Sequence, residues 1–269
     1  MSSILIIGES GSGKSSSLRN INGKEAILIN SLNKPLPFRG GAKKFGNNIV
    51  FTDDPRVIIQ KIYEAERNKK IKLIIIDDFQ AIMTNAFMCS INDRGYEKFT
   101  KIGKDIWDIV NAANKCRHDL KVVLLAHSET DINGKIKCKT IGKLVDEKIS
   151  IEGMCTVVLH SKIINGKYNF LTQNDGTSIA KSPIGMFKTI EIGNDLSEVI
   201  NAFDAYYDEE DVMPSISLIT KKQINELGEL LEKNNISEEN ISIMLKNGNA
   251  ITIDGLGSEY AQKCIDKLY

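Results

Sequence analysis

The sequence contains no run of eighteen consecutive apolar residues, the length that a membrane-spanning helix requires. Its five cysteines are scattered and form no CxxC pair, so neither a disulfide framework nor a zinc site is favoured, and reduced thiols in the cytoplasm are expected. No basic segment precedes the first apolar run, which we interpret as a buried strand and not as a signal peptide. Only six residues are arginine, which counts against small-molecule kinases with arginine-rich lids.

The charge of the chain is balanced overall but unevenly distributed. Residues 1–203 contain 29 basic and 22 acidic residues, a net charge of +7, whereas residues 204–269 contain 6 and 13, a net charge of −7. A basic first part is suited to binding a polyanion. A lysine-rich solvated surface explains the same balance, and the composition leaves both interpretations open.

Apolar runs of strand length alternate with helical patterns through the first 200 residues. Strands are predicted at Ser3–Ile7, Ala26–Asn30, Ile49–Phe51, Lys72–Asp77 and Lys121–His127, and helices at Lys14–Asn20, Pro55–Asn68, Tyr96–Cys116 and Leu196–Tyr207. This alternation is typical of an α/β fold in which helices cover both faces of a mostly parallel sheet. Towards the C-terminal end of this region, Cys155–Ile163 and Lys167–Thr172 flank an Asn165-Gly166 dipeptide, which predicts a hairpin.

The pattern changes near residue 208. Residues 208–214 are predicted to form an acidic linker between a core at 1–207 and a small all-α module at 215–269. Three helical patterns support the module, at Thr220–Lys233, Ser237–Lys246 and Ser258–Leu268.

A motif close to the N-terminus predicts a nucleotide site. Residues 8–15, GESGSGKS, fit the phosphate-loop pattern GxxxxGK[ST] and lie between a predicted strand and a predicted helix. Glycines let the backbone N–H groups point at phosphate, and the helix N-terminus adds positive partial charge. Lys14 is expected to act as the catalytic charge on the β- and γ-phosphates of ATP, and the Ser15 hydroxyl to ligate Mg²⁺. The predicted nucleotide-binding residues are Gly8, Glu9, Ser10, Gly11, Ser12, Gly13, Lys14, Ser15 and Ser16.

Acidic residues end a second apolar strand, LIIIDD at residues 73–78. Asp77 is predicted to hold the magnesium ion through water, and Asp78 to orient or deprotonate the attacking water. Capping of the next helix is the alternative role for both carboxylates. His127 ends another strand at the same predicted edge, where it either senses the γ-phosphate or is a histidine satisfied at the strand edge.

Several stretches together resemble one family. They are GESGSGKSSSLRNI, ILINSLNKPLPF, IIIDDFQAIM, LLAHSET, TIGKLVDEKISIEGMCTVVLHS and FLTQNDGTSIAKSPIGMF. Over roughly residues 1–205, these stretches are similar to phage RecA-like P-loop ATPases of the single-strand annealing and recombination group, which are often described only as phage nucleotide-binding or AAA-family proteins. The resemblance implies a RecA-like core, Mg²⁺-dependent ATP hydrolysis on single-stranded DNA, and a ring or filament in the cytoplasm of a bacterial host.

The resemblance also suggests roles for particular residues. Lys143 or Lys181 is a candidate for the lysine that reaches the γ-phosphate of a neighbouring subunit, and each is equally well a surface lysine or a DNA contact. The chain departs from the broader recombinase class at Asn30-Ser31, where a strand ends without the catalytic glutamate. Either Asp78 replaces that glutamate or hydrolysis is slow. The C-terminal module resembles the helical tails of phage recombination proteins, and a single-strand-binding protein is a candidate partner for it.

Two lysine-bearing segments are candidate DNA contacts, Leu32–Asn48 and Ser128–Ile141. The second contains three lysines and has Lys143 two residues beyond it, and a solvated β-hairpin is its alternative interpretation. Three classes of function remain. A DNA-recombination ATPase is the leading hypothesis, followed by a nucleotide-dependent scaffold with little turnover and by a small-molecule kinase.

Overall fold

The computed structural model describes residues 3–142, 149–207 and 217–269. The chain forms two compact units, Met1–Met213 and Pro214–Tyr269. The acidic linker predicted at 208–214 lies outside the described residues. Within the described ranges, no helix combines the length and the apolar character that a membrane crossing needs.

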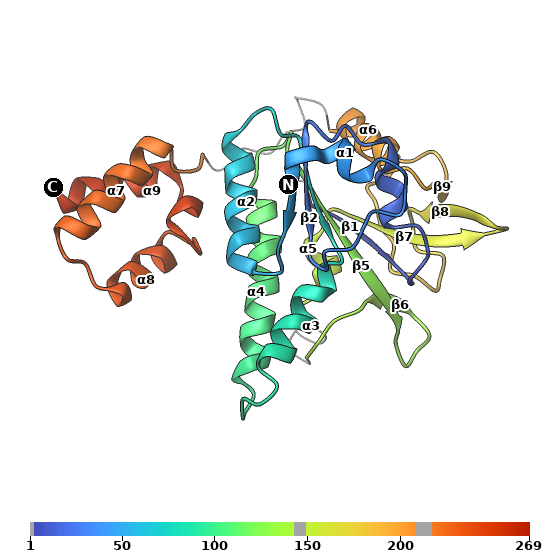
Figure 1. Cartoon of the computed structure of the whole chain (residues 1–269), viewed down its shortest axis with the longest axis horizontal. Coiled ribbons are helices and arrows are strands. Elements are labelled where there is room, and N and C mark those ends of the chain that lie inside the picture. The colour runs from blue at the N-terminus through green and yellow to red at the C-terminus, as the bar shows by residue number, and fades with distance from the viewer. Residues whose placement is uncertain (1–2, 143–148, 208–216) are drawn as a thin grey trace. The chain divides into compact units, whose positions relative to one another are not determined.

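A mostly parallel sheet forms the centre of the first unit (Figure 1). Its strands lie in the order β3 (Ile49–Phe51), β2 (Ala26–Asn30), β4 (Leu73–Asp77), β5 (Lys121–Thr130), β1 (Ser3–Gly8), β7 (Val157–Ile164), β8 (Lys167–Leu171) and β9 (Glu191–Gly193). The strands from β3 to β7 in this order run parallel, and β8 and β9 add antiparallel. Because parallel strands end at one edge of a sheet, the residues that follow β1, β4, β5 and β7 meet there.

Helices cover both faces of this sheet (Figure 1). One face packs against α2 (Pro55–Arg67), α3 (Phe79–Cys89) and α4 (Glu97–Asn114), and the other against η1 (Ser15–Asn20), α1 (Gly41–Phe45) and α6 (Leu196–Tyr206). Successive residues of β1 point to opposite faces of the sheet. Ile4 and Ile6 belong to the core beneath η1 and α6, whereas Leu5 and Ile7 are buried on the opposite face. The predicted α/β class, with helices on both faces of a mostly parallel sheet, is confirmed.

The helix after the phosphate loop differs from the prediction. It is a 3₁₀ helix of six residues, η1, and not the start of an α-helix. Three consecutive serines open it, and serine competes with the backbone for hydrogen bonds, which disfavours an α-helix. Only five residues then separate η1 from β2, so the chain has no length for further helical turns.

Other differences concern short or adjacent elements. The Leu32–Asn48 segment, expected as a loop, contains α1 and the 3₁₀ helix η2 (Gly46–Asn48), and α3 follows Asp78 directly. The strand β5 continues to Thr130 because its last residues pair with β6 (Ile136–Cys138), which forms an antiparallel hairpin with it. Strands of three residues, such as β6 and β9, are too short to give a recognisable alternation.

The predicted β7–β8 hairpin is confirmed. Its turn residues Asn165 and Gly166 have φ angles of 51° and 77°, which is the left-handed pair that a type I′ turn requires. The short helix α5 (Ile151–Met154) precedes β7.

The second unit consists of α7 (Lys221–Lys233), α8 (Glu238–Asn247), the 3₁₀ helix η4 (Ile253–Gly255) and α9 (Ser258–Leu268). Thr220 and Gln223 form a capping box at the start of α7, and Ser237 caps α8. Its core includes Leu227 and Leu256, so the apolar spacing of these helices serves packing within the unit.

Candidate nucleotide site

The phosphate loop connects β1 with η1 at the carboxyl edge of the sheet. A Cβ atom at Gly8 would lie 2.6 Å from the carbonyl oxygen of Ser161, and one at Gly13 would lie 2.7 Å from Cδ1 of Tyr168. Gly13 also has a φ angle of 98°, which side chains disfavour. Packing therefore favours glycine at position 8, and packing together with backbone conformation favours it at position 13, in addition to any need for close approach to phosphate.

Lys14 lies folded into the loop. Its Nζ donates hydrogen bonds to the carbonyl oxygens of Gly8 and Glu9, both at 2.8 Å. Burial lowers the pKa of Lys14 to about 8, although the nearby Asp78 and Asp77 carboxylates oppose this shift. Both of these acceptors are neutral carbonyl oxygens. A charged phosphate oxygen is a stronger acceptor for the ammonium group.

Ser15 and Asp77 are brought together across the site. The Ser15 hydroxyl donates to Oδ1 of Asp77 at 2.9 Å, although β5 separates the strands β1 and β4 that carry the two segments. Burial, and then the neighbouring Asp78, raise the pKa of Asp77 to about 6. A hydroxyl and a buried carboxylate are the oxygen donors that Mg²⁺ prefers, with nucleotide phosphates and water completing its shell.

Asp78 lies in a cluster with Lys34 and His127. Its Oδ2 is 3.2 Å from Lys34 Nζ, and its Oδ1 is 3.5 Å from His127 Nε2. The contact with His127, against the opposing effect of burial, holds the pKa of Asp78 below its usual range. Its φ angle of 58° is left-handed, a strained conformation that is often found at functional sites. Within the described structure the Asp78 side chain makes no capping bond to α3, which argues against the capping role.

His127 lies beside the first glycine of the loop. It is paired with Gly8 in the register of β5 and β1, and its backbone N–H donates to Oε1 of Gln80 at 3.0 Å. The strand-end rule therefore selected a residue that the structure brings to both the phosphate loop and Asp78.

Lys34 is a site residue that the motif analysis did not single out. Asn30, at the position without a glutamate, donates from Nδ2 to the Lys34 carbonyl oxygen at 2.7 Å and accepts from the Lys34 N–H at 3.2 Å. The amide thus orders the turn that presents Lys34 to Asp78. The stretch NKPLPF contains Lys34, so the signal was present in the sequence.

The two lysines considered for a role in trans have different outcomes. Lys181 pairs through its backbone with Val158, with both hydrogen bonds at 2.8 Å. Val158 is paired with Leu5, three residues before Gly8. Lys143 lies outside the described residues. A role in a neighbouring subunit stays a prediction for both.

The candidate DNA segment at Ser128–Ile141 is largely a β-hairpin. Lys137 forms an ion pair with Glu129, with Nζ and Oε1 3.5 Å apart. Lys135 and Lys139 are exposed. The hairpin predicted as the structural alternative is therefore present, and its two exposed lysines leave the DNA role open.

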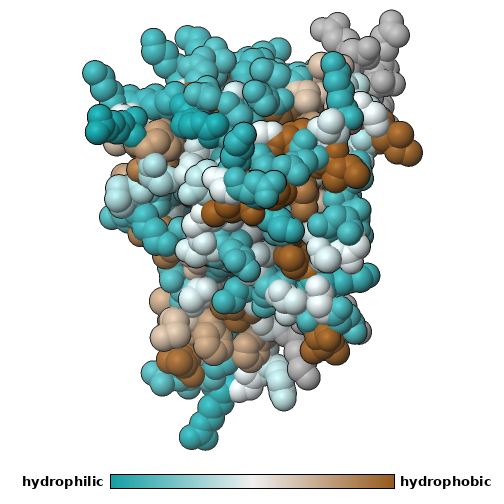
Figure 2. All heavy atoms as spheres, turned by 90° about the vertical axis from the view of Figure 1, so that its right-hand side faces the viewer, coloured by the Kyte–Doolittle hydropathy of each residue, from teal (hydrophilic) through white to brown (hydrophobic). Residues whose placement is uncertain are grey.

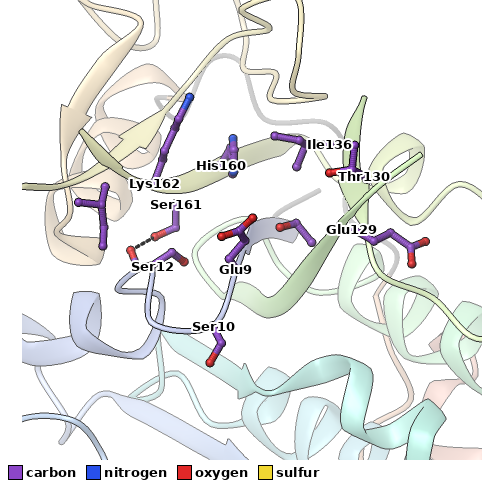
Figure 3. Close-up of a pocket in the computed structure, with 11 residues that line it drawn as sticks. Glu9, Ser10, Ser12, Glu129, Thr130, Ile136, His160, Ser161 and Lys162 are labelled. Carbon is purple, nitrogen blue, oxygen red and sulfur yellow. Dashed lines mark hydrogen bonds between the residues drawn. The ribbon is translucent and has the colours of Figure 1, made fainter. Parts of the chain in front are cut away.

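A cavity of about 370 Å³ adjoins the phosphate loop (Figure 3). Loop residues Glu9, Ser10 and Ser12 form one wall, and residues of the β5–β6 hairpin and of β7 form the others. Figure 3 shows His160 at the centre of the β7 wall. This side chain is 4% exposed, and burial lowers its pKa. Its Nδ1 has no hydrogen-bond partner among the described residues, so the wall contains a neutral imidazole that a bound molecule or water would satisfy.

His160 and Ser161 were missed although the rule that selected His127 applies to them. The stretch VVLHS runs through β7, and its polar residues lie opposite the end of β1. The strand-end rule that indicates His127 on β5 indicates both residues when it is applied to β7.

Comparisons with known proteins found one domain family and similar solved structures. Residues 1–131 match the family model of the AAA domain, a range that contains the phosphate loop, Asp77, Asp78 and His127. No curated protein matches the chain. Among solved structures, a KaiC-like protein of the hyperthermophilic archaeon Pyrococcus horikoshii OT3 is similar, with 13% identity, a TM-score of 0.42, and coverage of 67% of this chain and 83% of that one. The first 131 residues of this chain are thus similar to an AAA domain, and the matched range contains a complete phosphate-loop motif at residues 8–15.

Proposed function

We propose that this protein is a Mg²⁺-dependent ATPase that acts on single-stranded DNA in recombination or annealing. The observation that carries the ATPase part is the 2.9 Å hydrogen bond between Ser15 and Asp77 beside the phosphate loop. In the proposal, Lys14 would exchange its carbonyl contacts for the β- and γ-phosphates, and Ser15 and Asp77 would hold Mg²⁺, Asp77 through water. The ion, when bound, neutralises charge on the phosphates.

Asp78 is proposed to orient the attacking water, with Lys34 and His127 fixing its carboxylate. Asp78→Asn is expected to lower ATP turnover by about 10²–10⁴, the usual range for a lost general base, while nucleotide affinity stays near wild type. Steady-state hydrolysis and titration with a fluorescent ATP analogue measure the two quantities. Asp119→Asn is the matched control, because Asp119 also contacts two basic side chains, Lys72 and Arg117, but precedes β5 at the opposite edge of the sheet. Normal hydrolysis by Asp78→Asn would assign the base to another residue.

A nucleotide-dependent oligomeric scaffold with little turnover is the second candidate function. Two observations favour it: β2 ends at Asn30 without a carboxylate, and the pKa of Asp78 is lowered, which weakens it as a base. Turnover of ATP by the purified protein, with and without single-stranded DNA, separates the candidates. Repeated turnover that DNA accelerates supports the ATPase, whereas tight binding with less than one turnover supports the scaffold.

The DNA part of the proposal is supported by charge and position. Residues 1–203 have a net charge of +7, and the β5–β6 hairpin with its exposed lysines borders the cavity at the phosphate loop. The face drawn in Figure 2 is mostly hydrophilic, and its hydrophobic residues form only small scattered groups. Such a face suits a charged polymer better than an apolar partner.

Replacing both Lys135 and Lys139 by alanine is expected to flatten the salt dependence of single-stranded DNA binding. Each neutralised phosphate contributes about −0.7 to the slope of log affinity against log salt, so the expected change is about 1.4 if both lysines contact phosphate. Fluorescence anisotropy with a labelled oligonucleotide over a salt series measures this slope.

The matched control is Lys69→Ala with Lys70→Ala, two exposed lysines that precede β4 at the amino edge of the sheet. An equal change in the control would show a general charge effect without a specific DNA path. Absence of binding at low salt, with and without a non-hydrolysable ATP analogue, would overturn the DNA part and favour the scaffold.

The proposal extends to assembly and partners through the family resemblance alone. We propose a ring or filament with nucleotide between subunits, in which Lys143 or Lys181 reaches the γ-phosphate of the neighbour. The helical unit at 217–269 is proposed to contact a single-strand-binding protein, and the cytoplasm of a bacterial host is the proposed compartment.

A further inference from the structure

The helix that follows the phosphate loop is short. The six residues of η1 form a 3₁₀ helix, which has poorer hydrogen-bond geometry than an α-helix and fixes few backbone groups. Within this segment, the Ser17 N–H donates to the Gly13 carbonyl at 3.0 Å, and the Ser17 hydroxyl to the Lys14 carbonyl at 2.6 Å. These bonds hold the C-terminal side of the loop, and Lys14 and the Ser12 N–H hold the carbonyl oxygen of Glu9. A contact from outside the loop is needed to fix the carbonyl oxygen of Ser12.

A buried serine on β7 supplies such a contact. The Ser161 hydroxyl donates to the carbonyl oxygen of Ser12 at 2.8 Å, the interaction dashed in Figure 3. Asn194 in turn donates from Nδ2 to the Ser161 hydroxyl at 3.4 Å. Ser161 is 1% exposed and Asn194 is 4% exposed, so water does not compete for these bonds.

The same turn between β9 and α6 also holds η1. Arg19 donates to the carbonyl oxygen of Asn194 at 2.5 Å, and Asn20 donates from Nδ2 to Oδ2 of Asp195 at 2.5 Å. Asp195 is itself fixed, because it caps α6 by accepting the Ser197 N–H at 2.9 Å. The turn between β9 and α6 therefore holds η1 directly, and it supports Ser12 of the phosphate loop through Ser161 of β7.

The contact with Ser12 has a consequence for the next N–H group. The peptide unit between Ser12 and Gly13 is planar and trans, so its C=O and N–H point in opposite directions. A carbonyl held outward by Ser161 directs the Gly13 N–H towards the inside of the loop. Inward N–H groups are what a phosphate loop offers to an anion.

We propose that Ser161, supported by Asn194, is a positioning residue that sets the affinity of the phosphate loop for nucleotide. The inference rests on the proposed binding of ATP to this loop. Ser161 touches no phosphate itself and acts by orienting the Ser12–Gly13 peptide.

The test compares ATP hydrolysis by wild type, Ser161→Ala and Ser161→Thr. Loss of the hydroxyl is expected to raise the KM for ATP about 10-fold, the usual effect of one lost buried hydrogen bond, with kcat within about threefold of wild type. Ser161→Thr retains the hydroxyl and is expected to restore KM to within about threefold. A residue with a purely structural role would lower the active fraction, and therefore kcat, without raising KM.

Ser3→Ala is the matched control. Ser3 is also fully buried, lies on the neighbouring strand β1 at the other edge, and donates from its hydroxyl to Oδ1 of Asn114 at 2.6 Å. Its variant is expected to show the same loss of thermal stability as Ser161→Ala and a KM within twofold of wild type.

Three outcomes overturn the inference. The first is an unchanged KM in a folded Ser161→Ala protein, and the second is an equal rise in KM for Ser3→Ala. If Ser161→Ala does not fold, Ser161→Cys replaces it. The thiol is a weak donor, so its KM is expected to rise about threefold. The third overturning outcome is an unchanged KM in Ser161→Cys. A separate experiment titrates the wild-type protein with a fluorescent ATP analogue. Absence of binding in that titration would overturn the proposed function together with this inference.

Discussion

Replacing Lys14 by alanine is expected to reduce ATP turnover at least about 10³-fold. The side chain is the buried cation of the loop, and its loss removes the point charge that would stabilise the γ-phosphate as negative charge develops on it. In the nucleotide-free protein, burial lowers its pKa to about 8, so the ammonium form predominates at pH 7. A coupled assay of ADP release at saturating ATP measures the effect.

The loss of turnover in Lys14→Ala should not come from unfolding. A lysine whose pKa is lower in the folded state than in the unfolded chain disfavours folding while it is charged, and alanine removes that cost. Thermal unfolding is therefore expected to stay close to wild type. Lys24→Ala, at an exposed lysine after η1, is the control and should hydrolyse ATP normally. Wild-type turnover by a folded Lys14→Ala protein would remove the phosphate-loop assignment.

Asp77→Asn is expected to have opposite effects on stability and on activity. Without a carboxylate at the proposed magnesium site, Mg²⁺-dependent hydrolysis should fall about 10²-fold or more. The nucleotide-free variant should nevertheless be more stable at pH 7, because burial raises the pKa of Asp77 to about 6. The difference of about two pKa units from an unfolded carboxyl corresponds to a cost of about 3 kcal/mol at pH 7. The amide retains an oxygen that can accept the Ser15 hydrogen bond.

The contribution of the Asp77 carboxyl group to the free energy of unfolding depends on pH. Below about pH 4 the carboxyl group is protonated in both states, and its favourable contribution to stability is fully present. That contribution is lost as the pH rises through about 6, where the folded protein must ionise a buried group. The stabilisation by Asp77→Asn should thus be largest at pH 7 and should shrink towards pH 4.

Thermal unfolding of wild type and Asp77→Asn at several pH values, without nucleotide, measures this difference. Destabilisation of Asp77→Asn at pH 7 would mean that the Asp77 anion makes net favourable contacts in the folded protein. Wild-type hydrolysis by the variant would place the magnesium ligand elsewhere.

Local patterns predicted the parts of this protein that are built from consecutive residues. Eight residues carry the whole phosphate-loop motif, and the apolar strand before Asp77 is contiguous, so their chemistry was readable without the fold. The Asn-Gly turn was equally local, and its two left-handed residues followed from side-chain sterics. The failure at η1 was also local in origin, because the glycine-and-serine motif predicts a loop–helix junction but not how far the helix continues.

Contacts between distant residues could not be predicted in this way. The bonds from Ser161 to Ser12, from Lys34 to Asp78 and from Ser15 to Asp77 join positions 149, 44 and 62 residues apart. They depend on the order of the strands, which places β5 between β4 and β1 and β7 on the other side of β1. The sequence alone determined which side chains are the candidates for binding phosphate and magnesium. Only the tertiary structure decided which residues hold them in position, because that choice is made where strand ends from separate segments meet at one edge of the sheet.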